Sequence, residues 1–198
     1  MRYNANMTQF EIGAEQLLHG NKAEALAIFQ RGADAKDPRC IFGVALMYYH
    51  GWGVKENRGH AKKLFNKCSG ELHRLAKTDG EAAYILARCY DTLSSEKFTK
   101  NDDDKALDLL EFAAEKEYPE AMYWLGVAYI GGTMLPVMPD WDEAEYYLKK
   151  CADLGMPSAM NKLASLYDMS SEDDEAAKWR QMAIEYGYDE STDSMREL

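Results

Sequence analysis

Residues 121–129 read Ala-Met-Tyr-Trp-Leu-Gly-Val-Ala-Tyr and carry the pattern that decides the fold. The pattern is a small residue, an aliphatic residue four positions later, Gly or Ala at five and Tyr at eight. It occurs four times, as Cys40/Val44/Ala45/Tyr48, Ala82/Leu86/Ala87/Tyr90, Ala121/Leu125/Gly126/Tyr129 and Ala159/Leu163/Ala164/Tyr167. A period of about 40 residues is typical of a repeat array, so the pattern predicts a solenoid.

A second pattern follows each of these segments and also precedes the first. An alanine is followed seven positions later by a small residue, in the pairs Ala25/Gly32, Ala61/Cys68, Ala106/Ala113, Ala144/Cys151 and Ala176/Ala183. Bulky apolar residues lie three positions after each alanine and, in four units, four positions after it. Spacings of three, four and seven share one face of a helix. Each unit is therefore predicted to be a helical hairpin, and Pro38, Pro119 and Pro157 are predicted to start helices.

These repeated residues carry a family resemblance. The stretch from Cys40 to Cys68 resembles the Sel-one-like repeat family, relatives of the tetratricopeptide repeat, through Tyr48, Gly51, Gly53, Val54, Ala61, Leu64 and Phe65. The resemblance extends over residues 39–187, and residues 10–36 are closer to a tetratricopeptide hairpin. It implies an all-α, right-handed superhelix of about five antiparallel helix pairs that binds other proteins. The sequence departs from the family pattern after Cys68, Tyr90 and Tyr129.

The repeat boundaries predict one array over residues 1–187. It consists of an N-terminal tetratricopeptide-like hairpin at 7–37 and Sel-one-like units at 38–80, 81–118, 119–156 and 157–187, with a polar tail at 188–198. In the last unit Arg180 replaces the Phe or Leu of the others, as expected for a helix with no successor.

Composition narrows the class of partner and the location. The formal net charge of −11 argues against nucleic acid and anionic membranes, which demand a surplus of Lys and Arg. It fits either a generally soluble acidic surface or, more specifically, a basic partner. No apolar stretch has the length of a signal peptide or membrane span, so we expect a cytoplasmic protein. The four cysteines occupy alanine-like positions at spacings that do not follow the repeat, which predicts reduced structural thiols.

Signals for chemistry are weak. Ser94 and Lys97 match an S-x-x-K pattern, but they fall between predicted helices and lack the companion motifs of that enzyme class. His50, His60 and Cys68 lack the spacing of a zinc site. We therefore expect no catalytic residue, no metal and no cofactor.

The first helix of each unit has a second face that an ordinary amphipathic helix would leave polar. At 100° per residue, the positions one before the small residue and two, six and nine after it lie opposite the packing face. We call these positions the first-helix stripe. They are Arg39, Phe42, Leu46, Tyr49; Glu81, Tyr84, Arg88, Asp91; Glu120, Tyr123, Val127, Ile130; and Ser158, Asn161, Ser165, Asp168. Met7, Phe10, Ala14 and Leu17 continue it toward the N-terminus.

Two interpretations of the stripe stay open: contact between neighbouring first helices, or a groove that binds a peptide or protein partner. In the second, the candidate residues are Arg39, Phe42, Leu46, Tyr49, Tyr84, Arg88, Asp91, Tyr123, Val127 and Asn161. The apolar loop with Met134, Leu135, Val137 and Met138 is a secondary candidate, although we favour its packing on the solenoid edge.

The sequence thus favours a non-enzymatic, protein-binding solenoid. The alternatives are an inhibitor or immunity-type protein that blocks a bacterial enzyme, a hydrolase of the kind proposed for cysteine-rich relatives, and a structural subunit that self-associates through its exposed ends as a weak homo-oligomer.

Overall fold

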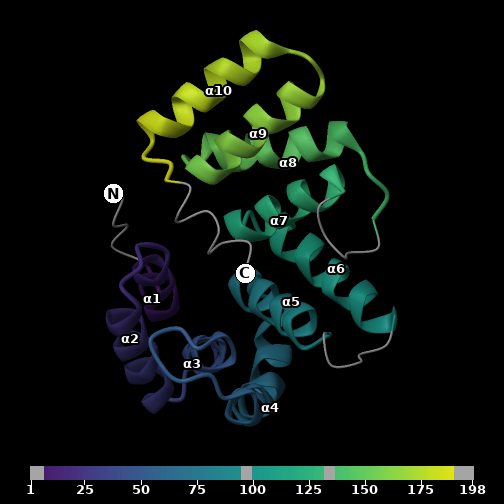
Figure 1. Cartoon of the computed structure of the whole chain (residues 1–198). Coiled ribbons are helices and arrows are strands. Elements are labelled where there is room, and N and C mark those ends of the chain that lie inside the picture. The colour runs from purple at the N-terminus through teal and green to yellow at the C-terminus, as the bar shows by residue number, and fades with distance from the viewer. Residues whose placement is uncertain (1–6, 95–99, 132–136, 190–198) are drawn as a thin grey trace. The chain divides into compact units, whose positions relative to one another are not determined.

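The computed structural model describes residues 7–94, 100–131 and 137–189, with the side chains of residues 91–94 and 100–103 outside that description. Within these ranges the chain forms helices and no strand (Figure 1). The helices are α1 (Gln9–Leu18), α2 (Lys22–Asp34), α3 (Pro38–His50), α4 (Arg58–Leu75), α5 (Gly80–Ser94), α6 (Lys100–Glu115), α7 (Pro119–Ile130), α8 (Trp141–Asp153), α9 (Pro157–Met169) and α10 (Asp173–Glu185). The predicted all-α class is confirmed.

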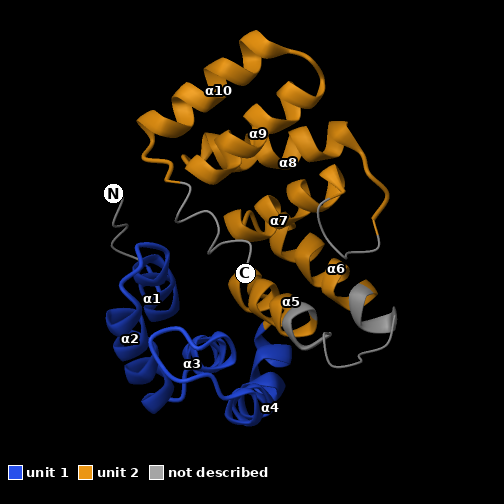
Figure 2. Ribbon diagram, in the orientation of Figure 1, with its two compact units in different colours: residues 1–75, 191–198 blue, residues 76–190 orange. Residues whose placement is uncertain are grey.

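Consecutive helices pack as pairs, so that α1, α3, α5, α7 and α9 are the first helices of five hairpins and the even-numbered helices are the second. The chain divides into two compact units (Figure 2). Unit 1 contains α1–α4, and unit 2, residues 76–190, contains α5–α10. The single array over residues 1–187 stays a prediction.

Helix starts and ends follow from local chemistry. Pro38, Pro119 and Pro157 are each the first residue of a helix, where proline's missing N–H leaves no bond unmade. At α8 the Asp140 carboxylate accepts hydrogen bonds from the backbone N–H groups of Asp142 and Glu143, at 3.0 and 3.1 Å. Gly51 ends α3 with a φ of 71°, in the left-handed region that glycine adopts without strain.

The repeated small residues let helices approach closely. At the first-helix positions zero, four and five, all four units have buried residues, and the repeated second-helix alanines are buried too. A Cβ added to Gly32 would lie 2.2 Å from the Cys40 Sγ, and one added to Gly126 would lie 2.7 Å from the Leu148 Cγ. These positions are small because the next helix occupies the space a side chain would need.

The tyrosine at position eight is half-buried in all four units and therefore lies at the edge of this packing. Tyr48 meets the His60 ring edge-on at 4.6 Å, and Tyr129 stacks on Tyr147 at 6.0 Å between centroids. The Tyr167 hydroxyl donates a hydrogen bond to Glu145 of α8. The repeat therefore places tyrosine at a helix seam, where its ring packs against a neighbouring ring in two units and its hydroxyl is hydrogen-bonded in the last.

Candidate protein-binding surface

Four half-buried side chains of unit 2 form one cluster on the stripe side of α5 and the neighbouring first helix α7. The Arg88 guanidinium carbon lies 4.4 Å from the centroid of the Trp124 ring, and its Nη1 donates a hydrogen bond of 3.3 Å to the Tyr84 hydroxyl. The Tyr84 ring in turn packs against Tyr118, with centroids 5.2 Å apart. We call these four residues the Arg88 cluster.

Local structure explains why these side chains meet. Tyr84 and Arg88 are four residues apart on α5 and therefore share one face of the helix. Tyr118 precedes Pro119, which disfavours the helical conformation at Tyr118, and Tyr118 is extended, with φ −75° and ψ 115°. The extended residue lies at the start of α7, where its ring contacts Tyr84.

The cluster has the chemistry of a recognition surface. The quadrupole of an indole ring attracts a guanidinium, and the weak hydration of the guanidinium favours this contact. The hydrogen bond to the Tyr84 hydroxyl also restricts the rotamers of Arg88. Arginine, tryptophan and tyrosine are the residue types enriched among the residues that dominate protein–protein affinity. The arrangement therefore offers a cation with fixed orientation beside flat aromatic area.

The other stripe residues of unit 2 take different places. Tyr123 is 2% exposed and Val127 is buried, so both belong to the core beneath the surface. The Asn161 Nδ2 donates a hydrogen bond of 2.9 Å to the Tyr188 hydroxyl, so the segment that follows α10 returns to α9. Asp91 lies in α5, but its side chain is outside the described residues.

In unit 1 the stripe residues are likewise divided between the core and the surface. Phe42 is 1% exposed and packs between Phe10 and Phe65, at centroid distances of 6.2 and 5.6 Å. Leu46, Tyr49 and Arg39 are half-buried. Arg58 lies over the Tyr49 ring at 5.1 Å, and the Arg39 Nη1 is 3.9 Å from the Asp37 Oδ1. The aromatic run of α3 therefore includes a core residue as well as residues that a partner could touch.

Sequence reasoning missed Trp124 and Tyr118. Trp124 lies three positions after Ala121, at about 300° on the helical wheel, whereas the stripe positions span about 180–260°. Widening the stripe by about 40° includes it. Tyr118 lies before the helix begins, so helical periodicity carries no information about its position.

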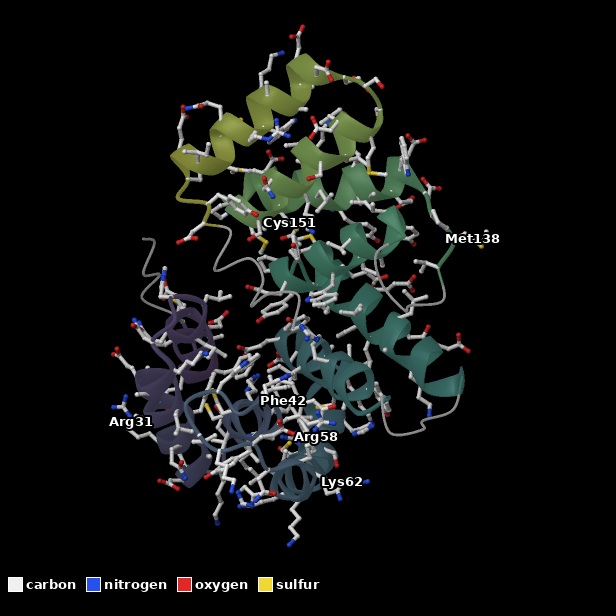
Figure 3. All side chains as sticks on the ribbon, in the orientation of Figure 1. Arg31, Phe42, Arg58, Lys62, Met138 and Cys151 are labelled. Atoms are coloured by element: carbon white, nitrogen blue, oxygen red, sulfur yellow. The ribbon has the colours of Figure 1, made fainter. Side chains whose placement is uncertain are left out.

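The secondary loop candidate falls partly outside the described residues, which contain neither Met134 nor Leu135. Val137 is half-buried, and Met138 is 83% exposed and projects away from unit 2 (Figure 3). The packing of this loop on the solenoid edge stays a prediction.

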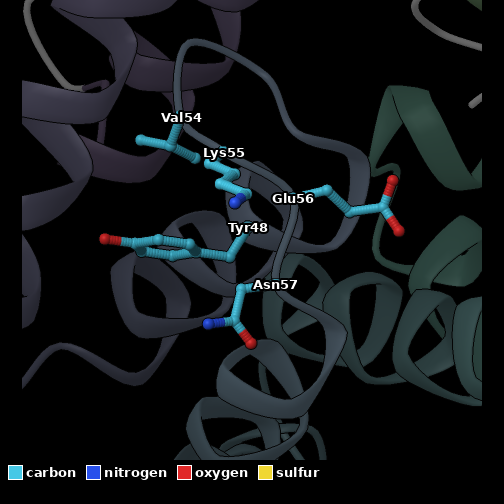
Figure 4. A pocket seen from close by; sticks show the side chains of 5 residues that line it. All are labelled: Tyr48, Val54, Lys55, Glu56 and Asn57. Carbon is cyan, nitrogen blue, oxygen red and sulfur yellow. The ribbon is translucent and has the colours of Figure 1, made fainter.

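A second surface feature lies at the Gly-rich turn of unit 1. Tyr48, Val54, Lys55, Glu56 and Asn57 line a pocket of about 490 Å³ (Figure 4). The sequence assigned Tyr48 to packing alone, yet its ring forms part of the pocket wall. His50 stacks on Trp52 at 4.3 Å and His60 meets Tyr48, so both histidines pack against aromatic rings.

None of the helices in the described ranges is both long and apolar enough to cross a bilayer.

Comparison with solved structures supports the fold. A Sel1 repeat protein from Oxalobacter formigenes is 24% identical with a TM-score of 0.56, over 91% of this chain and 72% of that chain. An immunity protein from Pseudomonas aeruginosa is 18% identical with a TM-score of 0.58, over 91% and 67% of the two chains. A protective antigen with an SLR fold, present in uropathogenic Escherichia coli strains, is 21% identical with a TM-score of 0.57; this chain spans 38% of its length. At these identities the likeness concerns the fold alone.

The family assignment comes from the repeats themselves. The sequence model of the Sel1 repeat matches residues 38–67, 80–118, 119–156 and 157–188, which together make up well over half of the chain. The four matches begin at the first residues of α3, α5, α7 and α9, which are Pro38, Gly80, Pro119 and Pro157. The chain therefore belongs to the Sel1 repeat family, whose helical solenoids typically serve as protein-interaction modules.

Proposed function

We propose that this protein is a non-enzymatic interaction module that binds a protein or peptide through the first-helix stripe, with the Arg88 cluster as the principal contact. The observation that carries the proposal is the contact of Arg88 with Trp124 and Tyr84 in a half-buried position. Interface anchors combine such packing with partial exposure, because they must be ordered before binding and desolvated after it.

The buried stripe residues have a supporting role in this proposal. Phe42, Tyr123 and Val127 are in the core and fix the backbone that carries the surface residues. Arg39, Leu46 and Tyr49 form the corresponding surface of unit 1. In unit 2, Asn161 contributes through its hydrogen bond to Tyr188. The four buried cysteines are all free thiols, which fits a reducing compartment, and the proposal includes a cytoplasmic location.

The experiment compares two double variants in pull-downs from lysate of the source cells. Tyr84→Ala/Arg88→Glu alters the Arg88 cluster, and Tyr186→Ala/Lys178→Glu makes the same truncation and charge reversal at exposed positions in and after α10. We expect the wild type and the α10 variant to recover the same partner and the cluster variant to lose it. Equal recovery by both variants would reject the Arg88 cluster as the contact.

A second candidate function is inhibition of an enzyme, because the fold is shared with an immunity protein. The same pull-down addresses it. If the captured partner is an enzyme, its activity in the presence of the wild type and of the cluster variant separates inhibition from adaptor binding.

A further inference from the structure

The net charge of −11 conceals a strong division of charge between the two units. Residues 1–75 contain eleven Lys and Arg against seven Asp and Glu, a net charge of +4. Residues 76–190 contain eleven Lys and Arg against 25 Asp and Glu, a net charge of −14, and residues 191–198 add the remaining −1. One half of the chain is therefore complementary in charge to the other half of a second copy.

The positive charge of unit 1 gathers on the outer face of α4. Ala61, Phe65, Cys68 and Leu72 form the buried face of this helix. Lys63, Lys67 and Arg74 are exposed on the opposite face, at relative positions 0, 4 and 11. Lys62 also projects from α4 (Figure 3), whereas Arg58 of the same helix pairs with Glu56 and lies over the Tyr49 ring. Within the described residues Lys63 and Lys67 make no ion pair, and Arg74 pairs only with Glu71 of its own helix, at 2.5 Å.

The outer face of α6 in unit 2 has the opposite charge at the same spacing. Asp104, Asp108, Glu111 and Glu115 are exposed at relative positions 0, 4, 7 and 11, and none of them has an ion-pair partner in the described part of the chain. Desolvation and the charges of Asp108 and Glu115 raise the pKa of Glu111. The neighbouring cation Lys105 lies over the Tyr90 ring, at 5.8 Å. These carboxylates repel one another, and a cationic surface would relieve that repulsion.

We propose that the basic face of α4 docks on the acidic face of α6 of a second copy of this chain. The α6 carboxylates, at positions 0, 4, 7 and 11, have the same spacing in either chain direction. The cations at positions 0, 4 and 11 of α4 can therefore each face a carboxylate whether the two helices run parallel or antiparallel. The contact is heterologous, since different surfaces of the two copies meet. In a pair of copies joined by one such contact, one copy retains an unused acidic α6 face and the other an unused basic α4 face. This proposal is independent of the Arg88 cluster, which lies on α5 and α7.

The test uses charge reversal and sedimentation equilibrium of the full chain. At about 0.1 M salt the Debye length is about 10 Å, so contact pairs persist while repulsion between the distant charges of two acidic chains is screened. We expect the wild type to associate under these conditions and to dissociate at about 1 M salt, where the Debye length is about 3 Å. The variants Lys63→Glu/Lys67→Glu and Asp108→Lys/Glu115→Lys should each weaken self-association at least about tenfold. Arg31→Glu/Lys36→Glu, with the same charge change at exposed residues of and beside α2, should associate like the wild type.

The mixture of the two reversed variants gives the decisive result. The first variant retains the acidic α6 and the second retains the basic α4, so an equimolar mixture should form a dimer that neither forms alone. A monomeric wild type across the accessible concentration range would overturn the proposal. A mixture that stays monomeric, or association that survives both reversals, would also overturn it.

Discussion

Arg88 and Trp124 lie on successive first helices of unit 2, with the guanidinium carbon 4.4 Å from the indole centroid. The contact therefore joins two repeats. In a double-mutant cycle of Arg88→Ala and Trp124→Ala, we expect a coupling free energy of about 0.5–2 kcal/mol, the range for a partly desolvated cation–π pair. Urea denaturation of the wild type, the two single variants and the double variant measures this coupling free energy. Strictly additive losses would mean that the two side chains are neighbours without a stabilising interaction.

Two glycines make a matched pair for testing the packing. Alanine at Gly32 would place a Cβ 2.2 Å from the Cys40 Sγ, so Gly32→Ala should lower the free energy of unfolding by about 1–3 kcal/mol. A Cβ at Gly70 of α4 would meet nothing within 4 Å, so Gly70→Ala should raise it by about 0.5–1 kcal/mol through helix propensity. Thermal denaturation of both variants gives the comparison. Shifts of the same sign would contradict the close approach at Gly32.

Small residues at fixed spacing made the packing face of the first helices predictable, because few positions of a helix pair tolerate only Gly, Ala or Cys. Phe42 and Tyr123 show where this reasoning ends. Helical periodicity places both opposite the packing face, yet both are buried, because a helix in a stacked array has neighbours on more than one side. Phe42, for example, packs against Phe10 of α1 and Phe65 of α4. Which stripe residues remain at the surface depends on those neighbours and not on the helix itself.

Tyr147 predicts how stability depends on pH. Burial, followed by the charges of Tyr129, Glu143 and Glu111, raises the pKa of Tyr147 from 10.0 to about 12. Because the unfolded chain releases this proton first, the stabilising effect is complete below pH 10 and is lost as the pH rises through about 12. Midpoints of thermal unfolding measured across this window should fall, and they should fall less steeply in Tyr147→Phe. An identical fall of the midpoint with pH in Tyr147→Phe would exclude Tyr147 as a source of the pH dependence.

The thiols should be unreactive in the folded protein. All four cysteines are buried, and burial raises the pKa of Cys68 to about 11, so little thiolate forms at neutral pH. Titration with a thiol reagent should therefore find slow reaction in the native state and four rapid equivalents in denaturant without reductant. Fewer than four equivalents in denaturant would indicate disulfides and an oxidising compartment.

The stripe can also be separated from the core by stability. Tyr84→Ala should weaken partner binding by about 1–3 kcal/mol, the range of interface anchors. Leu125→Ala, at a fully buried position of α7, should instead lower the free energy of unfolding by about 2–5 kcal/mol. Calorimetric titration with the captured partner and urea denaturation measure the two quantities. Unchanged affinity of Tyr84→Ala, together with a lower free energy of unfolding, would make Tyr84 a packing residue only.

The most direct test of the binding surface is photo-crosslinking with p-benzoyl-phenylalanine in place of Tyr84 or, as the control, Tyr186. Tyr84 belongs to the Arg88 cluster, whereas Tyr186 is a 56% exposed tyrosine at the end of α10. Binding through the first-helix stripe predicts that the partner is crosslinked from position 84 and not from position 186. Crosslinking from position 186 alone would contradict binding through the first-helix stripe and would indicate that the partner contacts the last helix.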